Sequence, residues 1–220
     1  MPVITISRQT GSGGMTIGQR LAERLQADYL NAQIIQQVAQ RLGMSEASAA
    51  RHNERGEGFI ERLARVLPGA DPSLTGQSRP AVPLAFESTT EAFVAITRQL
   101  VHEAARTGNV VIFGHGAQYI LAGQPRVLHV RFVAPLPARI ERVMRRERLN
   151  RTEAERRIHK EDQRRAGHLR QYYQADWAAP DPYHLILNTA LWNEEACIRL
   201  ILHAVEELRV LRTPADSLQS

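Results

Sequence analysis

Short apolar runs alternate with longer amphipathic segments along the whole chain. The apolar runs predict strands at 3–7, 28–30, 109–116, 126–135 and 183–189. Apolar residues at helical spacing predict helices at 14–26, 32–42, 87–107, 136–174 and 193–211. Within 136–174 a capping signal, Asn150 or Thr152 with Glu153 and Glu155 after it, predicts a turn between two helices. Because helices of ten residues or more lie between the strands, the pattern favours a parallel sheet with helices on both faces over antiparallel hairpins.

The length of 220 residues fits one domain, which we place at 1–212, followed by a flexible polar tail at 213–220. Residues 46–86 are the least regular part, with two helix-like pieces and a stretch rich in proline, glycine and serine. We interpret them as a helical and loop insertion within the domain.

Composition narrows the class of protein. The 43% apolar content supports a real core, and no apolar run reaches the ~18–20 residues that a membrane span needs. The only cysteine, Cys197, excludes an internal disulfide framework and any cysteine-built metal site. These features predict a cytoplasmic protein. The net charge of +5 comes mainly from arginine, which suits nucleotides as well as nucleic acids.

A glycine-rich stretch, GSGG at 11–14, follows the first predicted strand and precedes a helix. Glycines let the backbone turn sharply, and the N–H groups at the helix start then form an anion site. The dinucleotide pattern G-x-G-x-x-G fails because Thr16 stands at its last position, and the strict P-loop pattern fails for lack of lysine. A structural turn without a ligand stays an alternative. The candidate phosphate-binding residues are Gly11, Ser12, Gly13, Gly14, Met15 and Thr16.

The order of these motifs resembles the cytidylate kinase-like branch of the P-loop nucleoside monophosphate kinases. The start, ITIS followed by RQTGSGGMTIGQRLAERL, is similar to that family's first strand, phosphate loop and helix. Further similarities follow in order. YLNAQIIQQVA is similar to the family's acceptor-site helix, and VVIFGHGAQYIL to its strand that ends in Gly-Arg. HVRFVAPLPARIERVMRR is similar to a strand and the start of the lid, IHKEDQRR to the second half of the lid, and YHLILNTALWNEEACIRLI to the last strand and helix.

The resemblance implies a three-layer P-loop NTPase-type fold of about five parallel strands, with a helical lid at 136–174 and an acceptor-side insertion. It also implies ATP and Mg²⁺ as cofactors and a small phosphate-bearing or nucleoside acceptor. No metal site built from protein side chains is expected, because Mg²⁺ comes with the nucleotide. A homodimer is left open.

Several positions depart from the family pattern. Gly14 stands in place of the P-loop lysine, and Arg8 in place of the first glycine of that loop. A branch of the family reads SR-x-x-GSGG without the lysine, and this chain is similar to it. Phosphoryl transfer still needs cationic charge, so arginines are expected to supply it. The candidate catalytic residues are Arg8, Arg142, Arg164 and Arg165.

Two residues at strand ends are candidates for binding the acceptor. Asn31 replaces an aspartate of the acceptor site, and His115 replaces the arginine of the Gly-Arg turn. An acceptor contact from His115 and a structural role for it stay equally open.

Three functions compete. The first is an ATP-dependent phosphotransferase that acts on a nucleoside monophosphate or another small acceptor. The second is a catalytically weak or inactive nucleotide-binding regulatory protein, which the missing lysine favours. The third is a nucleic-acid-binding protein that uses the arginine-rich helices at 139–170, but this segment lacks interleaved aromatic residues apart from Tyr172 and Tyr173.

Overall fold

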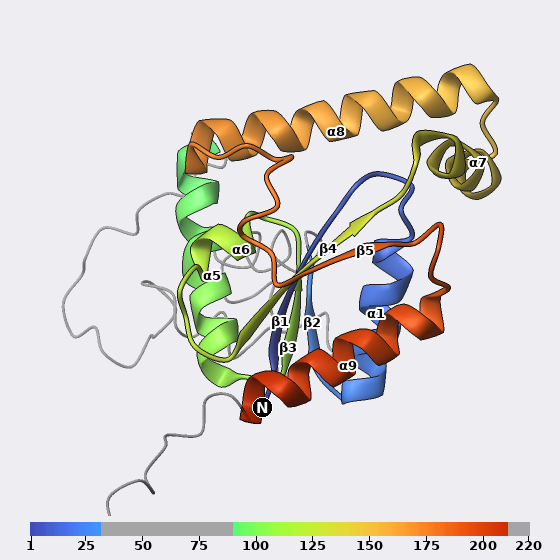
Figure 1. Ribbon diagram of the computed structural model, residues 1–220. Coiled ribbons are helices and arrows are strands. Elements are labelled where there is room, and N and C mark those ends of the chain that lie inside the picture. The colour runs from blue at the N-terminus through green and yellow to red at the C-terminus, as the bar shows by residue number, and fades with distance from the viewer. Residues whose placement is uncertain (32–89, 211–220) are drawn as a thin grey trace, which may run out of the picture.

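The structure is a computed structural model that describes residues 1–31 and 90–210 (Figure 1). Five strands form one parallel sheet in the order β2-β3-β1-β4-β5. The predicted fold class is therefore confirmed. The strands are β1 (Val3–Arg8), β2 (Asp28–Leu30), β3 (Val110–Phe113), β4 (Val127–Val133) and β5 (Leu185–Asn188).

Helices cover both faces of the sheet. One face carries α1 (Gly14–Leu25) and α9 (Glu194–Val210), and the other carries α5 (Thr90–Thr107) and the short α6 (Ala117–Ile120) (Figure 1). The alternation of side chains along each strand sends Ile4 and Ile6 to the first face and Val3 to the second, and all three are buried. The sheet is thus the middle of three layers.

The face under α5 and α6 also carries buried polar side chains. The Thr5 hydroxyl and Nδ1 of His129 lie 2.7 Å apart, and His129 stacks on His184 with ring centroids 5.1 Å apart. Burial lowers the pKa of His129 to about 4, and nearby His184 adds to the effect. Arg131 is also buried, with its guanidinium over the rings of Trp177 and Tyr183. Sequence reasoning predicted an apolar strand here and missed this polar stripe.

Two further helices, α7 (Leu136–Glu147) and α8 (Arg151–Tyr173), lie at the carboxyl edge of the sheet. Their small apolar interface includes Val143, Ala154 and Ile158. Asn150 and Glu153 form a capping box at the start of α8, as the sequence predicted. Figure 1 shows α8 crossing above the carboxyl ends of the strands, from α7 to the N-terminal end of α5.

Some predictions lie outside the described residues: the helix at 32–42, the insertion at 46–86 and the tail at 213–220. Within the described part, the four-residue helix α6 was not predicted, because it is too short to show apolar periodicity. None of the helices described here is long and apolar enough to cross a membrane.

Candidate active site

The loop between β1 and α1 depends on its glycines. Gly11 and Gly13 have φ angles of +80° and +79°, in the left-handed region that favours glycine. A Cβ on Gly11 would lie 2.7 Å from the carbonyl oxygen of Arg139, so α7 packs directly against the loop backbone. A Cβ on Gly13 would meet no atom within 4 Å. The loop is therefore packed on the side of α7 and open at Gly13, where α1 begins.

Three successive carbonyl groups of the loop are bound by residues from other elements. The carbonyl of Thr10 accepts from Arg139 Nη1 at 3.3 Å, and that of Gly11 accepts from Arg142 Nη1 at 3.4 Å. The carbonyl of Ser12 accepts from the Thr189 hydroxyl at 2.6 Å. These bonds turn the carbonyl oxygens toward α7 and the end of β5. The first N–H groups of α1, which have no partner within a helix, are left to bind an anion.

Gln9 fixes the beginning of the same loop. Its main-chain N–H donates to the carbonyl of Phe132 at 3.0 Å, and its side-chain oxygen accepts from the N–H of Ala134 at 3.0 Å. The loop is thus tied to the end of β4 before it reaches the glycines.

Arg8 ends β1 and extends over the neighbouring strand β3. Its guanidinium carbon lies 4.1 Å from the centre of the Phe113 ring, and Nη1 lies beside Gly114. The side chain therefore points toward the turn after β3 and does not turn back across the glycine loop. Burial, followed by the charge of Arg165, lowers the pKa of Arg8 to about 9. No carboxylate among the described residues lies within ion-pairing distance of Arg8.

Gly14 stands where a P-loop lysine would be, and its surroundings explain the absence of a side chain. A Cβ at this position would lie 2.8 Å from the ring of Phe132 and 3.1 Å from Cβ of Arg8. Phe132 is fully buried in a close-packed core, where a shift of its ring is costly. Phe132 therefore fills the space that a longer side chain at position 14 needs.

The four candidate catalytic arginines fall into different places. Arg165 reaches the loop, since its Nη1 donates to the Thr10 hydroxyl and, at 3.1 Å, to Asp162. Arg142 is engaged by the loop carbonyl of Gly11 and by Thr189. Arg164 has a side chain that is 72% exposed and pairs with Glu161, and its charge contributes to the lowered pKa of Arg8. The structure thus places Arg165 and Arg142 against the loop, while Arg8 lies over Phe113 and Arg164 is exposed.

The turn after β3 places His115 beside Arg8. His115 has a φ of +60°, and its carbonyl accepts from the Tyr173 hydroxyl at 3.2 Å. Burial, the charge of Arg8 and the neighbouring His168 lower the pKa of His115 to about 4, so the imidazole is neutral at pH 7. Asn31 directly follows β2, the next strand of the sheet, and both candidate acceptor residues therefore lie at the carboxyl edge.

The C-terminal end of α8 is fixed on the same turn. A Cβ on Gly116 would lie 2.6 Å from the ring of Tyr173, so the aromatic ring rests directly on the glycine. Tyr173 also stacks on Tyr119 at 5.8 Å between ring centres and lies under the guanidinium of Arg98. This aromatic contact joins α8 to both α5 and α6.

Sequence reasoning missed three residues that shape the site: Asp162, Thr189 and Tyr173. Thr189 directly follows the last strand, and the rule that ligands bind at the carboxyl ends of strands could have found it. Asp162 gave no such signal, because it looks like an ordinary surface partner of nearby arginines on one helix.

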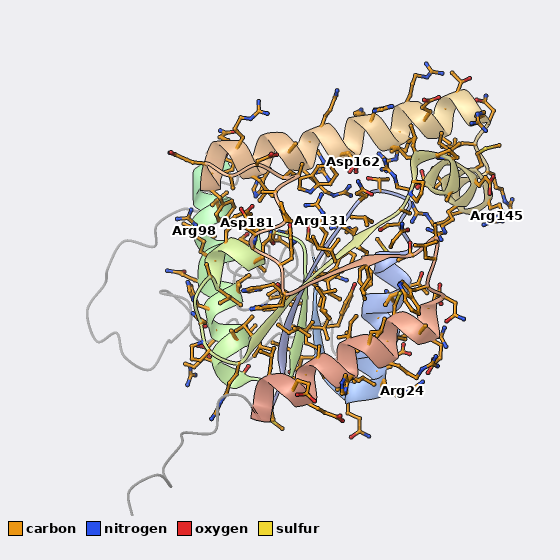
Figure 2. All side chains as sticks on the ribbon, viewed as in Figure 1. Arg24, Arg98, Arg131, Arg145, Asp162 and Asp181 are labelled. Carbon is orange, nitrogen blue, oxygen red and sulfur yellow. The ribbon has the colours of Figure 1, made fainter. Side chains whose placement is uncertain are left out.

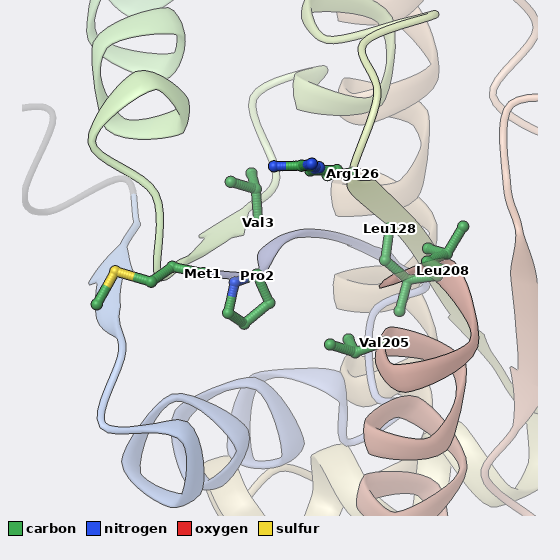
Figure 3. Close-up of a pocket in the computed structure, with 7 residues that line it drawn as sticks. All are labelled: Met1, Pro2, Val3, Arg126, Leu128, Val205 and Leu208. Atoms are coloured by element: carbon green, nitrogen blue, oxygen red, sulfur yellow. The ribbon is translucent and has the colours of Figure 1, made fainter. Parts of the chain in front are cut away.

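A separate cavity of about 210 Å³ lies at the opposite, amino edge of the sheet (Figure 3). The residues that line it are Met1, Pro2, Val3, Arg126, Leu128, Val205 and Leu208. Most of this lining is apolar, and none of these described residues belongs to a glycine loop or a helix start, so we place the candidate site at the glycine loop. Among the described residues, no three His, Cys, Asp or Glu side chains gather as a metal site.

Known proteins resemble this chain over nearly its whole length. The cytidylate kinase of Methanopyrus kandleri is 26% identical over 94% of this chain and 94% of its own length. The cytidylate kinase of Ignicoccus hospitalis is 27% identical over 91% of this chain and 97% of its own length. The crystal structure of an uncharacterized protein from Eubacterium ventriosum has a TM-score of 0.67 at 16% identity, covering 94% of this chain and 99% of that one, which shows a shared fold.

The family comparison covers the part of the chain that holds the site. The model of the cytidylate kinase-like family matches residues 3–191, from the first residue of β1 to just beyond Thr189. That range includes the glycine loop, the turn after β3 and both helices at the carboxyl edge. The chain therefore belongs to the cytidylate kinase-like family.

Proposed function

We propose that this protein is an ATP-dependent phosphotransferase that acts on a nucleoside monophosphate or another small acceptor. Membership of the cytidylate kinase-like family supports a nucleotide kinase, and the names of the archaeal relatives support a nucleoside monophosphate acceptor. The observation that carries the proposal is the orientation of the loop carbonyls of Thr10, Gly11 and Ser12 away from the start of α1.

The residues present fit a bound triphosphate. The N–H groups at the start of α1, from Gly14 onward, would hold phosphate oxygens, aided by the positive end of the helix. Gly13, which has open space around it, allows a ligand to approach the backbone closely. Thr16 is exposed in the first turn of α1, where a hydroxyl can serve a phosphate or Mg²⁺. When bound, ATP supplies the phosphoryl group, and Mg²⁺ neutralises charge on its phosphates.

Arg8 and Arg165 would supply the charge that the missing lysine would have given. Arg8 is cationic at pH 7, because its lowered pKa, about 9, still lies above that pH, and Arg165 is paired with Asp162. Two neighbouring cations in a partly desolvated place strongly favour an anion between them. Arg8 lies over the end of β3, so it would stabilise the phosphoryl group on the side of the acceptor.

His115 and Asn31 would hold the acceptor. A neutral imidazole can both accept and donate a hydrogen bond, whereas a charged one only donates. Asn31 has no titratable group and would act by hydrogen bonding alone. Neither residue is needed as a base if the acceptor is a phosphate, because its oxygens are already deprotonated at neutral pH.

The experiment that tests the proposal measures binding first and transfer second. MgATP should raise the Tm of the wild-type protein, and inorganic sulfate at the same ionic strength should raise it less. ADP formation should then be followed with a panel of nucleoside monophosphates, nucleosides and other small phosphate esters. ADP release that depends on one of these acceptors supports the kinase. No release with any of them, and no shift of Tm, contradicts it.

A second candidate function is a nucleotide-binding protein of weak or absent catalytic activity. The packing of Phe132 against Gly14 favours it, because even a Cβ at that position would lie 2.8 Å from the Phe132 ring. A shift of Tm by MgATP without acceptor-dependent ADP release would support this function over the kinase.

A further inference from the structure

Two residues of helix α8, Asp162 and Arg165, touch the loop between β1 and α1 at Thr10. Asp162 lies on the side of α8 that faces the sheet (Figure 2), and its side chain is only 13% exposed. One oxygen, Oδ1, accepts from the main-chain N–H of Thr10 at 2.9 Å and from the Thr10 hydroxyl at 2.7 Å. These two residues are 152 positions apart in the sequence.

The same carboxylate binds two arginines. Its Oδ1 accepts from Arg165 Nη1 at 3.1 Å, and its Oδ2 accepts from Arg139 Nη1 at 2.6 Å. Arg139 is itself buried and donates to the Thr10 carbonyl. Asp162 therefore lies where the glycine loop, α7 and α8 meet, and it contacts all three.

Asp162 neutralises a buried arginine that the neighbouring carboxylate on α8 does not pair with. The neighbouring carboxylate Glu161, whose side chain is only 14% exposed, pairs with Arg157 and Arg164, and it lies 3.7 Å from Arg165. Asp162 is the described carboxylate that faces the buried Arg139. Removing one partner of a buried ion pair leaves an uncompensated charge, which costs far more than an exposed pair contributes.

From these contacts we propose that Asp162 is a positioning residue for phosphoryl transfer: it holds Arg165 next to Thr10 and thereby sets the place of a cation beside the glycine loop. The inference rests on the proposed function, because it assigns Asp162 a role at the same site. The hydrogen bonds of Asp162 go to Thr10, Arg139 and Arg165, so it would act through these residues.

The first test compares Asp162→Asn with Glu155→Gln, a matched loss of one charge on an exposed part of the same helix. Glu155 has an exposed side chain and lies 4.0 Å from His159. Isothermal titration calorimetry with MgATP should show binding weakened about tenfold or more in Asp162→Asn and unchanged in Glu155→Gln. Equal affinity of Asp162→Asn and the wild type, with the same Tm, would overturn the inference.

The second test asks whether Asp162 acts through Arg165. In a double-mutant cycle, Arg165→Met should weaken MgATP binding alone, and adding Asp162→Asn to it should weaken binding little further. A general loss of structure would instead give additive losses, so additive losses would overturn the inference.

A third variant covers the case in which Asp162→Asn does not fold. Thr10→Val removes only the hydroxyl that Asp162 and Arg165 share and leaves the main-chain N–H in place. Its MgATP affinity should fall about threefold or more at an unchanged fold, and an unchanged affinity would overturn the inference. A wild type that fails to bind MgATP at all would contradict the proposed function instead, so the two failures can be told apart.

Discussion

The hydroxyl of Thr189, which follows the last strand of the sheet, donates a hydrogen bond of 2.6 Å to the carbonyl of Ser12. This bond joins residues 177 positions apart and ties the last strand to the glycine loop that follows the first. Arg142 supports it from α7 by donating to both the hydroxyl and the carbonyl of Thr189. The shape of the loop is thus set by contacts from β5 and α7 as well as by its glycines.

Thr189→Val tests this contact, because it keeps the shape of the side chain and removes the hydroxyl. The buried carbonyl of Ser12 would lose its donor, which costs about 1–3 kcal/mol. We expect a lower free energy of unfolding in urea and weaker MgATP binding. Thr152→Val, at an exposed position of α8, is the control and should change neither. Wild-type values for Thr189→Val would show that the bond does not shape the loop.

Gly14→Lys restores the residue type of the P-loop pattern, yet we expect it to harm the protein. Its Cβ would lie 2.8 Å from the buried ring of Phe132, and overpacking of this kind costs about 1–3 kcal/mol. Thermal unfolding should show a lower Tm, and ADP formation should not increase. A Gly14→Lys variant with wild-type stability and faster turnover would contradict the packing argument.

Arg8→Met removes the cation that has no described carboxylate partner and keeps an apolar chain over Phe113. A charge-assisted hydrogen bond is worth about 1.5–3 kcal/mol, so turnover or MgATP affinity should fall about tenfold or more. Arg24→Met is the control. Arg24 lies on α1 (Figure 2), and its half-exposed side chain pairs with Glu195. Equal kinetics for both variants would remove Arg8 from the site.

The two histidines with a lowered pKa predict a loss of stability in acid. His115 and His129 each have a folded pKa of about 4, below the ordinary value of 6.5, so the unfolded chain binds more protons between these values. Their contribution to stability is complete above pH 6.5 and is lost as the pH falls toward 4. The free energy of unfolding in urea should fall by at most ~1.4 kcal/mol per pH unit for each histidine in this window.

A variant identifies the source of this pH dependence. His129→Gln keeps a polar side chain near Thr5 and removes the titrating ring, so stability should depend less steeply on pH between 4 and 6.5. His203→Gln is the control, because that histidine is exposed on α9. An unchanged slope in His129→Gln would place the acid sensitivity elsewhere.

Much of the fold could be predicted because each strand is a local signal. Val110–Phe113 is buried on both faces of the sheet and is a continuous apolar run followed by Gly114, while Val3–Arg8 alternates apolar and small polar residues before the glycines at 11–14. The glycine loop was found for the same reason, since its residues are adjacent in the sequence. Asn150 and Glu153 also form a local pattern, and the helix start they mark is where it was predicted.

The rest of the site could not be predicted, because its contacts join distant segments. Asp162 and Thr10, or Thr189 and Ser12, share no local pattern, and only the folded sheet brings them together. The direction of Arg8 depended on the ring of Phe113, which lies on a different strand. Charged residues on α8 look alike in the sequence, although Arg165 faces the loop and Arg164 faces solvent.

One uninterrupted helix, α8, contacts the glycine loop at Asp162 and the turn after β3 at Tyr173. These two contacts are 11 residues apart along the helix, or ~16 Å at 1.5 Å per residue. Because the helix is uninterrupted, a small tilt of α8 about Asp162 would displace Tyr173 by a larger amount. A change at the glycine loop that shifts Asp162 is therefore expected to shift Tyr173 and the turn after β3 as well.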